Sequence, residues 1–283
     1  MKLAFFNDYQ LGVINGEQIV DVASALGGVS YHSPQELIET LIKDWDNLQP
    51  QIAQAAEGNA GTALNSVRLR APLPRPNQLV CLAGNYIEPA APDRGEFNAF
   101  LKSPTGIIGK GDTVQLPETN ATVFHFEPEL SVVIGKTASH LSQAEAMDHV
   151  FGYTQFIDVS ARGLPGGFFL GKSWHTFAPM GPALVTADEV SDPNDLGIKL
   201  WVNDELRHDF SSDSMARFIP EVLEEVTKVI TLEPGNVVNT GTHHYALAPI
   251  QDGDNLRLEI EGFGPSLTID VHDPLKRTSW EAH

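Results

Sequence analysis

Residues 124–135 read FHFEPELSVVIG, and polar and apolar residues alternate along this run as they do in a β-strand. Successive side chains of a strand point to opposite faces of the sheet, so His125, Glu127 and Glu129 share one face. The other face holds only apolar side chains as far as Leu130. The pattern therefore predicts two carboxylates side by side on an otherwise apolar strand.

Two neighbouring carboxylates repel each other, so one of them takes up a proton unless a cation lies between them. A hard divalent metal, which prefers oxygen ligands, removes this conflict. The alternative is an edge strand whose polar face meets water, and Pro128 favours it because proline cannot donate a hydrogen bond to a sheet. The alternation of Glu127 and Glu129 leaves both interpretations open.

A third carboxylate lies in the run 151–163, FGYTQFIDVSARG, which is rich in strand-forming residues. Asp158 stands near the end of this run, and a buried aspartate needs a partner. Arg162 would give a structural ion pair. A metal shared with Glu127 and Glu129 would give a site of three carboxylates.

Two further segments contain polar groups that suit a small anionic ligand. Lys172 lies in the run 168–182, FFLGKSWHTFAPMGP, which is an unusual place for an ammonium group without an anion to meet. The run 232–242, LEPGNVVNTGT, ends in a Thr-Gly-Thr loop at Thr242. Such a loop can offer hydroxyl and backbone N–H groups to a carboxylate, and it fits an ordinary turn equally well.

The chain divides at residues 71–76, APLPRP, because three prolines favour extended chain over helix. Residues 1–71 predict a small α/β domain with a hairpin turn at Asn15-Gly16. Helices are expected after Ser33, with a capping box completed by Glu36, and over about residues 48–56.

From residue 78 to residue 283, short strands punctuated by glycine and proline predict a β-barrel or sandwich-like roll. Two helices interrupt this pattern. One begins at Ser142 with a capping box to Glu145, and the other covers about residues 214–230.

Bulk properties exclude several classes of protein. The formal charge of −19 argues against nucleic acid or an anionic membrane as a partner. No apolar run is long enough to span a bilayer, and the N-terminus lacks the pattern of a secretory signal. Cys81 is the only cysteine, so an internal disulfide is excluded, and a reducing compartment suits it. We expect a soluble, cytoplasmic protein.

Five segments, in order and spacing, resemble the fumarylacetoacetate hydrolase superfamily, and the resemblance covers about residues 78–271. The segments are 100–104 (F-x-K-x-P), 127–136 (E-x-E-L…IGK), 152–162 (GYT…D-x-SAR), 171–182 (GKS…P-x-GP) and 232–242 (L-x-PG…TGT). The resemblance implies an α+β, mainly β fold. A small N-terminal α/β domain, residues 1–71, would precede a mixed β-roll or barrel-like domain, residues 78–283, usually in a homodimer.

The resemblance also implies a metal centre. Glu127, Glu129 and Asp158 would hold Mg²⁺, Mn²⁺ or Ca²⁺, and Lys172 would contact the substrate. The expected substrate is a small 2-oxo acid or diketo acid. The other predicted substrate contacts are Tyr86, Lys102, Tyr153, Arg162 and Thr242.

This chain departs from the family at one important place. Family hydrolases carry an N-Y-x-x-H-x-x-E segment whose His and Glu activate the attacking water, whereas residues 85–92 here read NYIEPAAP. Pro89 and Pro92 replace the two proton-transfer residues, and proline cannot transfer protons. The family's D-x-Q after the SAR segment is also absent.

Another base is therefore needed, and each histidine considered for it fits surface exposure or packing as well. His125 is favoured because strand alternation places it on the ligand face. The remaining candidates are Glu88, Glu96, His175 and the pair His243-His244. The predicted catalytic residues are Lys172, His125 and Glu96.

The expected function is a Mg²⁺- or Mn²⁺-dependent hydrolase that cleaves a C–C bond in an acylpyruvate-like 2-oxo or 1,3-dicarbonyl acid. The metal would stabilise an enolate, and Lys172 would add positive charge beside it. The first alternative is an oxaloacetate-type decarboxylase or a keto–enol isomerase on the same scaffold, which the missing dyad favours. The second is a metal-binding protein without catalytic activity.

Overall fold

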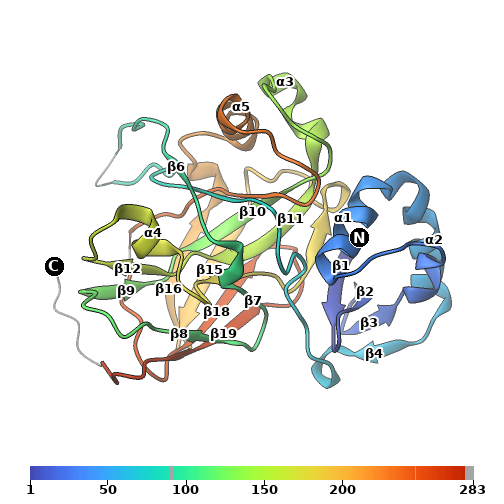
Figure 1. Ribbon diagram of the computed structural model, residues 1–283, viewed down its shortest axis with the longest axis horizontal. Coiled ribbons are helices and arrows are strands. Elements are labelled where there is room, and N and C mark those ends of the chain that lie inside the picture. The colour runs from blue at the N-terminus through green and yellow to red at the C-terminus, as the bar shows by residue number, and fades with distance from the viewer. Residues whose placement is uncertain (90–91, 246, 278–283) are drawn as a thin grey trace.

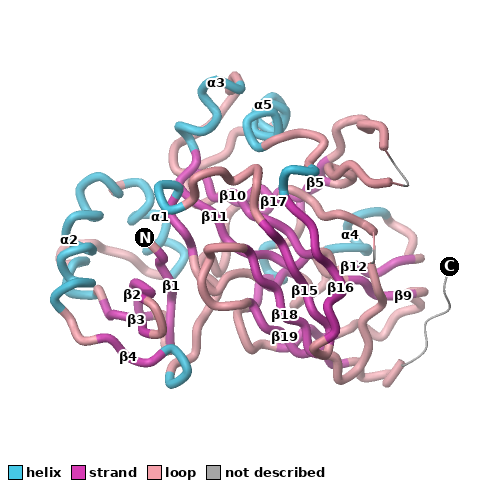
Figure 2. Tube along the Cα trace, turned by 180° about the vertical axis from the view of Figure 1, so that it is seen from behind, coloured by secondary structure: helices cyan, strands magenta, loops and turns pink. Residues whose placement is uncertain are grey.

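The computed structural model describes residues 1–89, 92–245 and 247–277 (Figure 1). Two sheets dominate this part of the chain, and β15 and β18 of the smaller sheet pack against β10 and β11 of the larger one (Figure 2). The mixed, mainly β architecture predicted from the sequence is confirmed.

The larger sheet has ten strands in the described residues, in the order β4-β3-β2-β1-β14-β11-β10-β17-β5-β6. Its strands are β1 (Lys2–Phe6), β2 (Gln10–Asn15), β3 (Gln18–Asp21), β4 (Gly61–Ala63), β5 (Leu79–Leu82), β6 (Ala99–Leu101), β10 (Pro128–Ile134), β11 (Val150–Ile157), β14 (Leu184–Thr186) and β17 (Val237–Asn239). Within the described residues, the edge strands β4 and β6 do not pair with each other. The sheet is therefore open, and the barrel-like closure considered above is not formed.

The smaller sheet has five strands in the described residues, in the order β16-β15-β18-β19-β8. They are β8 (Thr113–Gln115), β15 (Gly197–Val202), β16 (Glu205–Ser211), β18 (Asn255–Ile260) and β19 (Leu267–His272). Two short pairs complete the strands: β9 (Val123–His125) with β12 (Ser160–Arg162), and β7 (Ile107–Ile108) with β13 (Ala178–Pro179).

The helices lie at the periphery of the sheets (Figure 1). The α-helices are α1 (Pro34–Lys43), α2 (Trp45–Gly58), α3 (Gln143–Ala146), α4 (Gly167–Lys172) and α5 (Ile219–Val229). Short 3₁₀ turns cover Ala23–Leu26, Leu64–Ser66, Pro104–Gly106, Met147–His149, Ala187–Glu189 and Ser212–Ser214.

The predicted helix starts are partly correct. The Ser33 hydroxyl caps α1 by accepting from the Glu36 backbone N–H at 3.1 Å, but the Glu36 carboxylate accepts from the His32 N–H rather than from Ser33. The capping box at Ser142 is present on the short helix α3. Helix α5 begins at Ile219, later than predicted, because Pro220 suits only the first turn of a helix.

The predicted hairpin is also displaced by one residue. Asn15 pairs with Gln18, so the turn consists of Gly16 and Glu17 rather than of Asn15 and Gly16. Gly16 supplies the positive φ, of 58°, that this tight connection needs.

The N-terminal segment continues the larger sheet across the proline-rich linker. Strand β1 pairs with β14 through Lys2↔Val185 and Leu3↔Leu184. The buried face of α1 joins the same hydrophobic cluster as Leu3 and Leu184. The division into domains at residues 71–78 stays a prediction.

The segment 124–135 forms two strands rather than the single strand that we expected. Strand β9 ends at His125 and β10 begins at Pro128, whose ring nitrogen has no hydrogen to donate. At this break the Glu127 carbonyl accepts from the backbone N–H of Asp158 at 2.8 Å. Strand β10 is buried along its whole length between β11 and β17, so the solvated edge strand is excluded.

None of the helices in the described ranges combines the length and the apolar character that crossing a bilayer requires.

Candidate metal and substrate site

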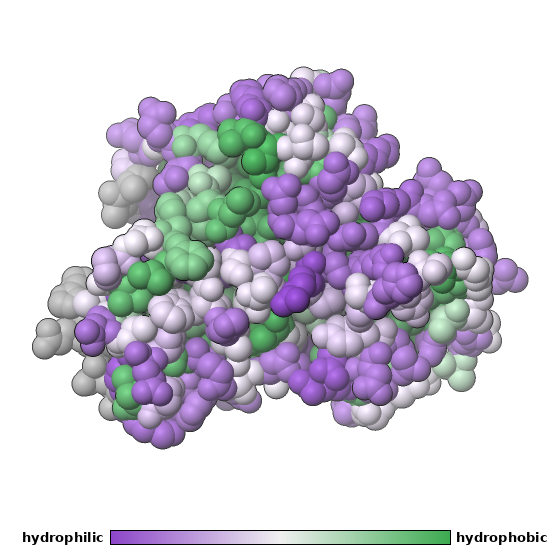
Figure 3. Space-filling model, viewed as in Figure 1, coloured by the Kyte–Doolittle hydropathy of each residue, from purple (hydrophilic) through white to green (hydrophobic). Residues whose placement is uncertain are grey.

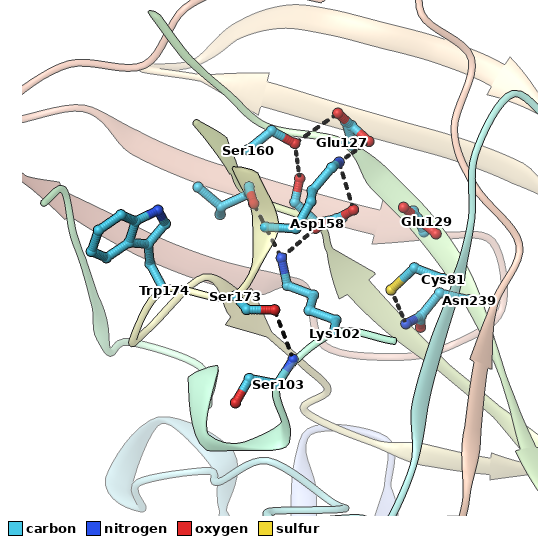
Figure 4. A network of polar contacts seen from close by, with 12 residues as sticks. Cys81, Lys102, Ser103, Glu127, Glu129, Asp158, Ser160, Ser173, Trp174 and Asn239 are labelled. Carbon is cyan, nitrogen blue, oxygen red and sulfur yellow. Dashed lines mark hydrogen bonds and ion pairs between the residues drawn. The ribbon is translucent and has the colours of Figure 1, made fainter. Parts of the chain in front are cut away.

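Three carboxylates meet where β10 begins and β11 ends. The antiparallel pairing of Pro128 with Ile157 places Glu127, just before β10, beside Asp158, just after β11. Glu129 follows on β10, and all three side chains are buried. One oxygen from each carboxylate lies within 4.8 Å of the others. Figure 4 labels the three side chains. Sheet register therefore builds the three-carboxylate group.

Lys172, the last residue of α4, is paired with two of the carboxylates, as expected for an ammonium group among apolar residues. Its Nζ donates to Glu127 Oε2 and to Asp158 Oδ2, each at 2.7 Å. Burial by itself lowers the pKa of Lys172, but the charges of Asp158 and Glu127 raise it above its ordinary value. The ammonium group stays charged and adds a fixed positive charge to the site.

Two further residues predicted to contact the substrate, Lys102 and Arg162, bind the carboxylates in this structure, and their substrate-binding roles stay predictions. Lys102 donates from Nζ to Asp158 Oδ1 and, at 3.1 Å, to the Val159 carbonyl. Arg162 donates to Glu127 Oε1 and keeps its side chain 38% exposed. The prediction of a structural ion pair between Asp158 and Arg162 is therefore wrong, because the cations that pair with Asp158 are Lys102 and Lys172.

Glu129 has the fewest partners of the three acids. Its Oε2 accepts from the Gly241 backbone N–H at 2.7 Å, while Oε1 is buried without a hydrogen-bond partner among the described residues. Burial, followed by the charges of Asp158 and Glu127, raises the pKa of Glu129 well above its ordinary range. A cation at the free oxygen would remove this cost.

The donor set fits a hard divalent cation. A carboxylate offers about four lone-pair sites, and the side-chain contacts on Asp158 use two of them. The lysines can therefore stay in place while the same carboxylates coordinate an ion. Oxygen-only ligands of this kind suit Mg²⁺, Mn²⁺ or Ca²⁺ rather than a soft metal.

Other unpartnered polar atoms lie around the acids. Thr242 Oγ1 is buried without a partner in the described chain, one residue beyond the Gly241 N–H that binds Glu129. His125 Nδ1, on β9, is likewise buried without a hydrogen-bond partner among the described residues. Burial, and then the charge of Arg162, lower the pKa of His125 to about 4, so its ring is neutral near pH 7.

Sequence reasoning missed His208, which lies on β16. Its ring is buried, and neither ring nitrogen has a hydrogen-bond partner in the described residues. The ring packs edge-on against Phe126 and Phe210, with distances of 5.5 and 5.9 Å between ring centroids. The surrounding ELRHDFS run shows no motif, so only the packing of the two sheets could reveal this residue.

Tyr86 and Tyr153 are both buried. The Tyr86 ring packs against Phe210, its hydroxyl lies 3.4 Å from Thr240 Oγ1, and burial together with the charge of Glu129 raises its pKa. Tyr153 lies in the hydrophobic core, where Asp192 is the charge that acts on it. Glu96 and His175 are exposed. The catalytic and substrate-binding roles of all these residues stay predictions.

Two of the alternative bases, however, are joined by the fold. Glu88 Oε1 accepts from the backbone N–H of His244 at 2.6 Å and lies 3.1 Å from the ring Nδ1 of the same residue. Nothing in the sequence links residues so far apart.

Cys81 lies beside Glu129 as a buried thiol (Figure 4). Its sulfur accepts from Asn239 Nδ2 at 3.2 Å, and burial raises the pKa of the thiol well above its ordinary value. The thiolate needed for reactivity is thereby suppressed.

Residues 78–269 match the family model described as "Fumarylacetoacetate (FAA) hydrolase C-terminal". The chain belongs to the fumarylacetoacetate hydrolase family. The matched range contains all three carboxylates, Lys172 and the Thr-Gly-Thr loop.

Relatives in this family have different reactions in their names. The chain is 36% identical over 251 residues to oxaloacetate tautomerase YisK of Bacillus subtilis, covering 81% of this chain and 83% of the relative. It is 31% identical over 288 residues to maleylpyruvate hydrolase of Aquipseudomonas alcaligenes, covering 96% and 99%.

A solved relative is similar along almost its whole length. Maleylpyruvate hydrolase of Sphingobium sp. SYK-6, in complex with manganese(II) ion and pyruvate, is 35% identical with a TM-score of 0.87, and the alignment covers 96% of this chain and 99% of that one. This chain is an enzyme of the family, and the interpretation as a metal-binding protein without catalytic activity is not retained.

Proposed function

We propose that this enzyme is a Mg²⁺- or Mn²⁺-dependent hydrolase that cleaves a C–C bond in a small acylpyruvate-like 2-oxo acid. The observation that carries the proposal is the group Glu127, Glu129 and Asp158, buried together, with Glu129 Oε1 unpartnered among the described residues. Lys102, Lys172 and Arg162 pair with Glu127 and Asp158, but no described cation contacts Glu129. Burying its free oxygen is costly without a cation, so a structural role alone does not account for Glu129.

Glu127, Glu129 and Asp158 would hold the divalent cation, which would supply Lewis-acid activation of the substrate's keto group. The chain's own residues supply the rest. Lys172 offers a positive charge beside that position, and Thr242 offers an unused hydroxyl to a substrate oxygen. Burial of the carboxylates excludes bulk water and strengthens these interactions.

The charge balance of the site favours an anionic substrate. Three carboxylates are opposed by three contacting cations: Lys102, Lys172 and Arg162. A divalent cation alone would leave excess positive charge, which a 2-oxo acid would offset. Binding of metal and of substrate should therefore reinforce each other.

The relatives support the same proposal. One similar chain is a maleylpyruvate hydrolase, and a solved maleylpyruvate hydrolase holds manganese and pyruvate together. Pyruvate is the fragment that cleavage of any acylpyruvate would release.

Keto–enol tautomerisation of oxaloacetate is the second candidate. The observation in its favour is that Pro89 and Pro92 occupy the positions of the family's water-activating His and Glu. Tautomerisation moves a proton but adds no water, so it does not need that pair. The tautomerase YisK is a relative of this chain.

The test is a turnover panel on metal-free enzyme with added Mg²⁺ or Mn²⁺, using acylpyruvates and oxaloacetate. We expect metal-dependent release of pyruvate and a carboxylic acid, measured by NMR. Enol–keto interconversion without cleavage would favour the tautomerase, and CO₂ release would favour the decarboxylase. Full turnover in the presence of a strong chelator would contradict the metal-dependent proposal.

A further inference from the structure

We propose that Glu88 and His244 form the proton-transfer pair of this enzyme, with His244 as the general base and Glu88 as its positioning residue. The inference rests on the proposed function and identifies groups that replace the missing His and Glu. No sequence motif points to the pair, which the fold alone assembles.

The contacts orient the imidazole ring. Glu88 Oε1 binds both the backbone N–H of His244, at 2.6 Å, and its ring Nδ1, at 3.1 Å. Because the carboxylate accepts, Nδ1 carries the hydrogen and Nε2 keeps a free lone pair. A base held by an acid in this way resembles the arrangement that activates nucleophiles in other hydrolases.

Hydrogen bonds fix the backbone near both partners. Ile87 donates its backbone N–H to the Ser214 carbonyl at 2.8 Å, which fixes the backbone next to Glu88. His244 lies three residues beyond Gly241, whose N–H binds Glu129. This backbone contact ties the loop that leads to His244 to the carboxylate group.

The exposure of the two side chains suits their roles. The Glu88 side chain is 12% exposed, whereas that of His244 is 38% exposed. The carboxylate is thus shielded from competing water, and the imidazole remains accessible to substrate and to an attacking water molecule.

The other histidines near the site lack such a partner. Among the described residues, the histidines in ion-pair contact with a carboxylate are His244 and His272, and His272 lies at the end of β19 beside Asp252. His125 Nδ1 is buried without a partner in that part of the chain. We therefore prefer His244 to His125 as the general base, and the catalytic role of His125 stays a prediction.

The proposed step balances as follows for an acylpyruvate. His244 Nε2 takes a proton from water while the water oxygen bonds to the acyl carbonyl carbon. The bond from that carbon to the pyruvate fragment breaks, and its electron pair remains on the fragment as an enolate. The proton on His244 then passes to the enolate carbon, which gives pyruvate and a carboxylic acid.

The experiment compares wild type with His244→Gln and Glu88→Gln, using an acylpyruvate and Mn²⁺. We expect kcat of His244→Gln to fall by about 10²–10⁴-fold, the usual contribution of a general base. KM and the Mn²⁺ affinity measured by calorimetry should stay close to wild type. Glu88→Gln should lower kcat less, and the double variant should be no slower than His244→Gln because the residues act as a unit.

Two further arms separate catalysis from structure. Free imidazole should restore part of the activity of His244→Ala, which it would not do for a histidine that only packs. His272→Gln removes the histidine of the remote pair with Asp252, and its kcat should equal that of wild type.

The outcomes separate this inference from the proposed function. If wild type cleaves the substrate and His244→Gln retains full kcat, or if the two losses are additive, the pair is refuted while the hydrolase stands. If wild type only exchanges the C3 protons of oxaloacetate, the hydrolase fails and the pair is judged by loss of exchange in His244→Gln. If wild type does neither, both fall.

Discussion

Glu129 is the residue on which the candidate metal centre can be tested most directly. Its Oε1 is buried without a partner in the described chain, and its neighbours are other carboxylates. We expect Glu129→Gln to lower Mn²⁺ affinity by at least about 100-fold while leaving the metal-free protein as stable as before or more stable. Calorimetric titration and thermal unfolding measure the two effects.

Glu17→Gln is the matched control for Glu129→Gln, because Glu17 is an exposed glutamate in the β2–β3 turn. Its Mn²⁺ affinity should equal that of wild type. An unchanged affinity in Glu129→Gln would rule out the metal centre at these carboxylates.

The buried His208 makes the stability of the fold depend on pH in the acid range. Burial lowers its pKa from 6.5 to about 4, so between these values the unfolded chain binds a proton that the folded chain refuses. The contribution of the neutral His208 ring to the free energy of unfolding is therefore fully present above pH 6.5 and is lost as the pH falls towards 4. The pKa difference corresponds to a loss of about 2 kcal/mol between pH 7 and pH 5.

We expect His208→Leu to remove this pH-dependent loss, because both ring nitrogens lack partners in the described residues and no hydrogen bond is broken. Urea unfolding at pH 5 and pH 7 measures the change. The exposed His32, substituted by Gln, should keep the pH dependence of wild type. An unaltered slope in His208→Leu would show that the neutral buried ring does not contribute it.

At the scale of the element, close packing of β11 against β14 explains the glycine of the GYT segment. A Cβ at Gly152 would lie 2.2 Å from the Val185 carbonyl oxygen and 3.0 Å from Thr186 Cα. Both obstacles are backbone atoms, so the strands must separate to admit a methyl group. Because β11 ends at Ile157, next to Asp158, such a shift would reach the site.

Gly152→Ala should therefore destabilise the protein by about 1–3 kcal/mol, as overpacking usually does. Chemical denaturation measures the loss. Gly58→Ala at the end of α2 is the control, since a Cβ there meets nothing within 4 Å. Equal stabilities of the two variants would contradict the steric argument.

At the scale of the whole molecule, the N-terminal segment shares its core with the rest of the chain. Phe5 on β1 is fully buried and belongs to the same hydrophobic cluster as Phe156 and Met180. We expect unfolding in a single cooperative transition, and Phe5→Ala should weaken the entire fold by about 3–5 kcal/mol. Calorimetry would contradict this if residues 1–71 melted separately and Phe5→Ala shifted only that transition.

The molecular surface bears on the expected homodimer, which stays a prediction. Hydrophobic residues gather over β6 and α4 on the face shown in Figure 3, and Leu101 and Phe169 are among the exposed ones. Light scattering on the full chain would give its mass in solution, to be compared with 30.8 kDa for one chain.

The sequence by itself indicated the family, through five short segments in order, and it determined the fold class and the types of residue at the site. These depend on local properties: alternation around Glu127 and Glu129, a lone Asp158 in an apolar run, and a buried Lys172 that needs an anion. Each can be recognised within about ten residues, because strand periodicity and the cost of burying a charge act over that range.

Only the tertiary structure decided which groups contact one another. Glu88 and His244 are 156 residues apart, and no periodicity relates them. The break before Pro128, the shared core of β1 and the burial of His208 also depend on how sheets pack. Such contacts follow from the simultaneous fit of the whole chain, so no short stretch of sequence contains them.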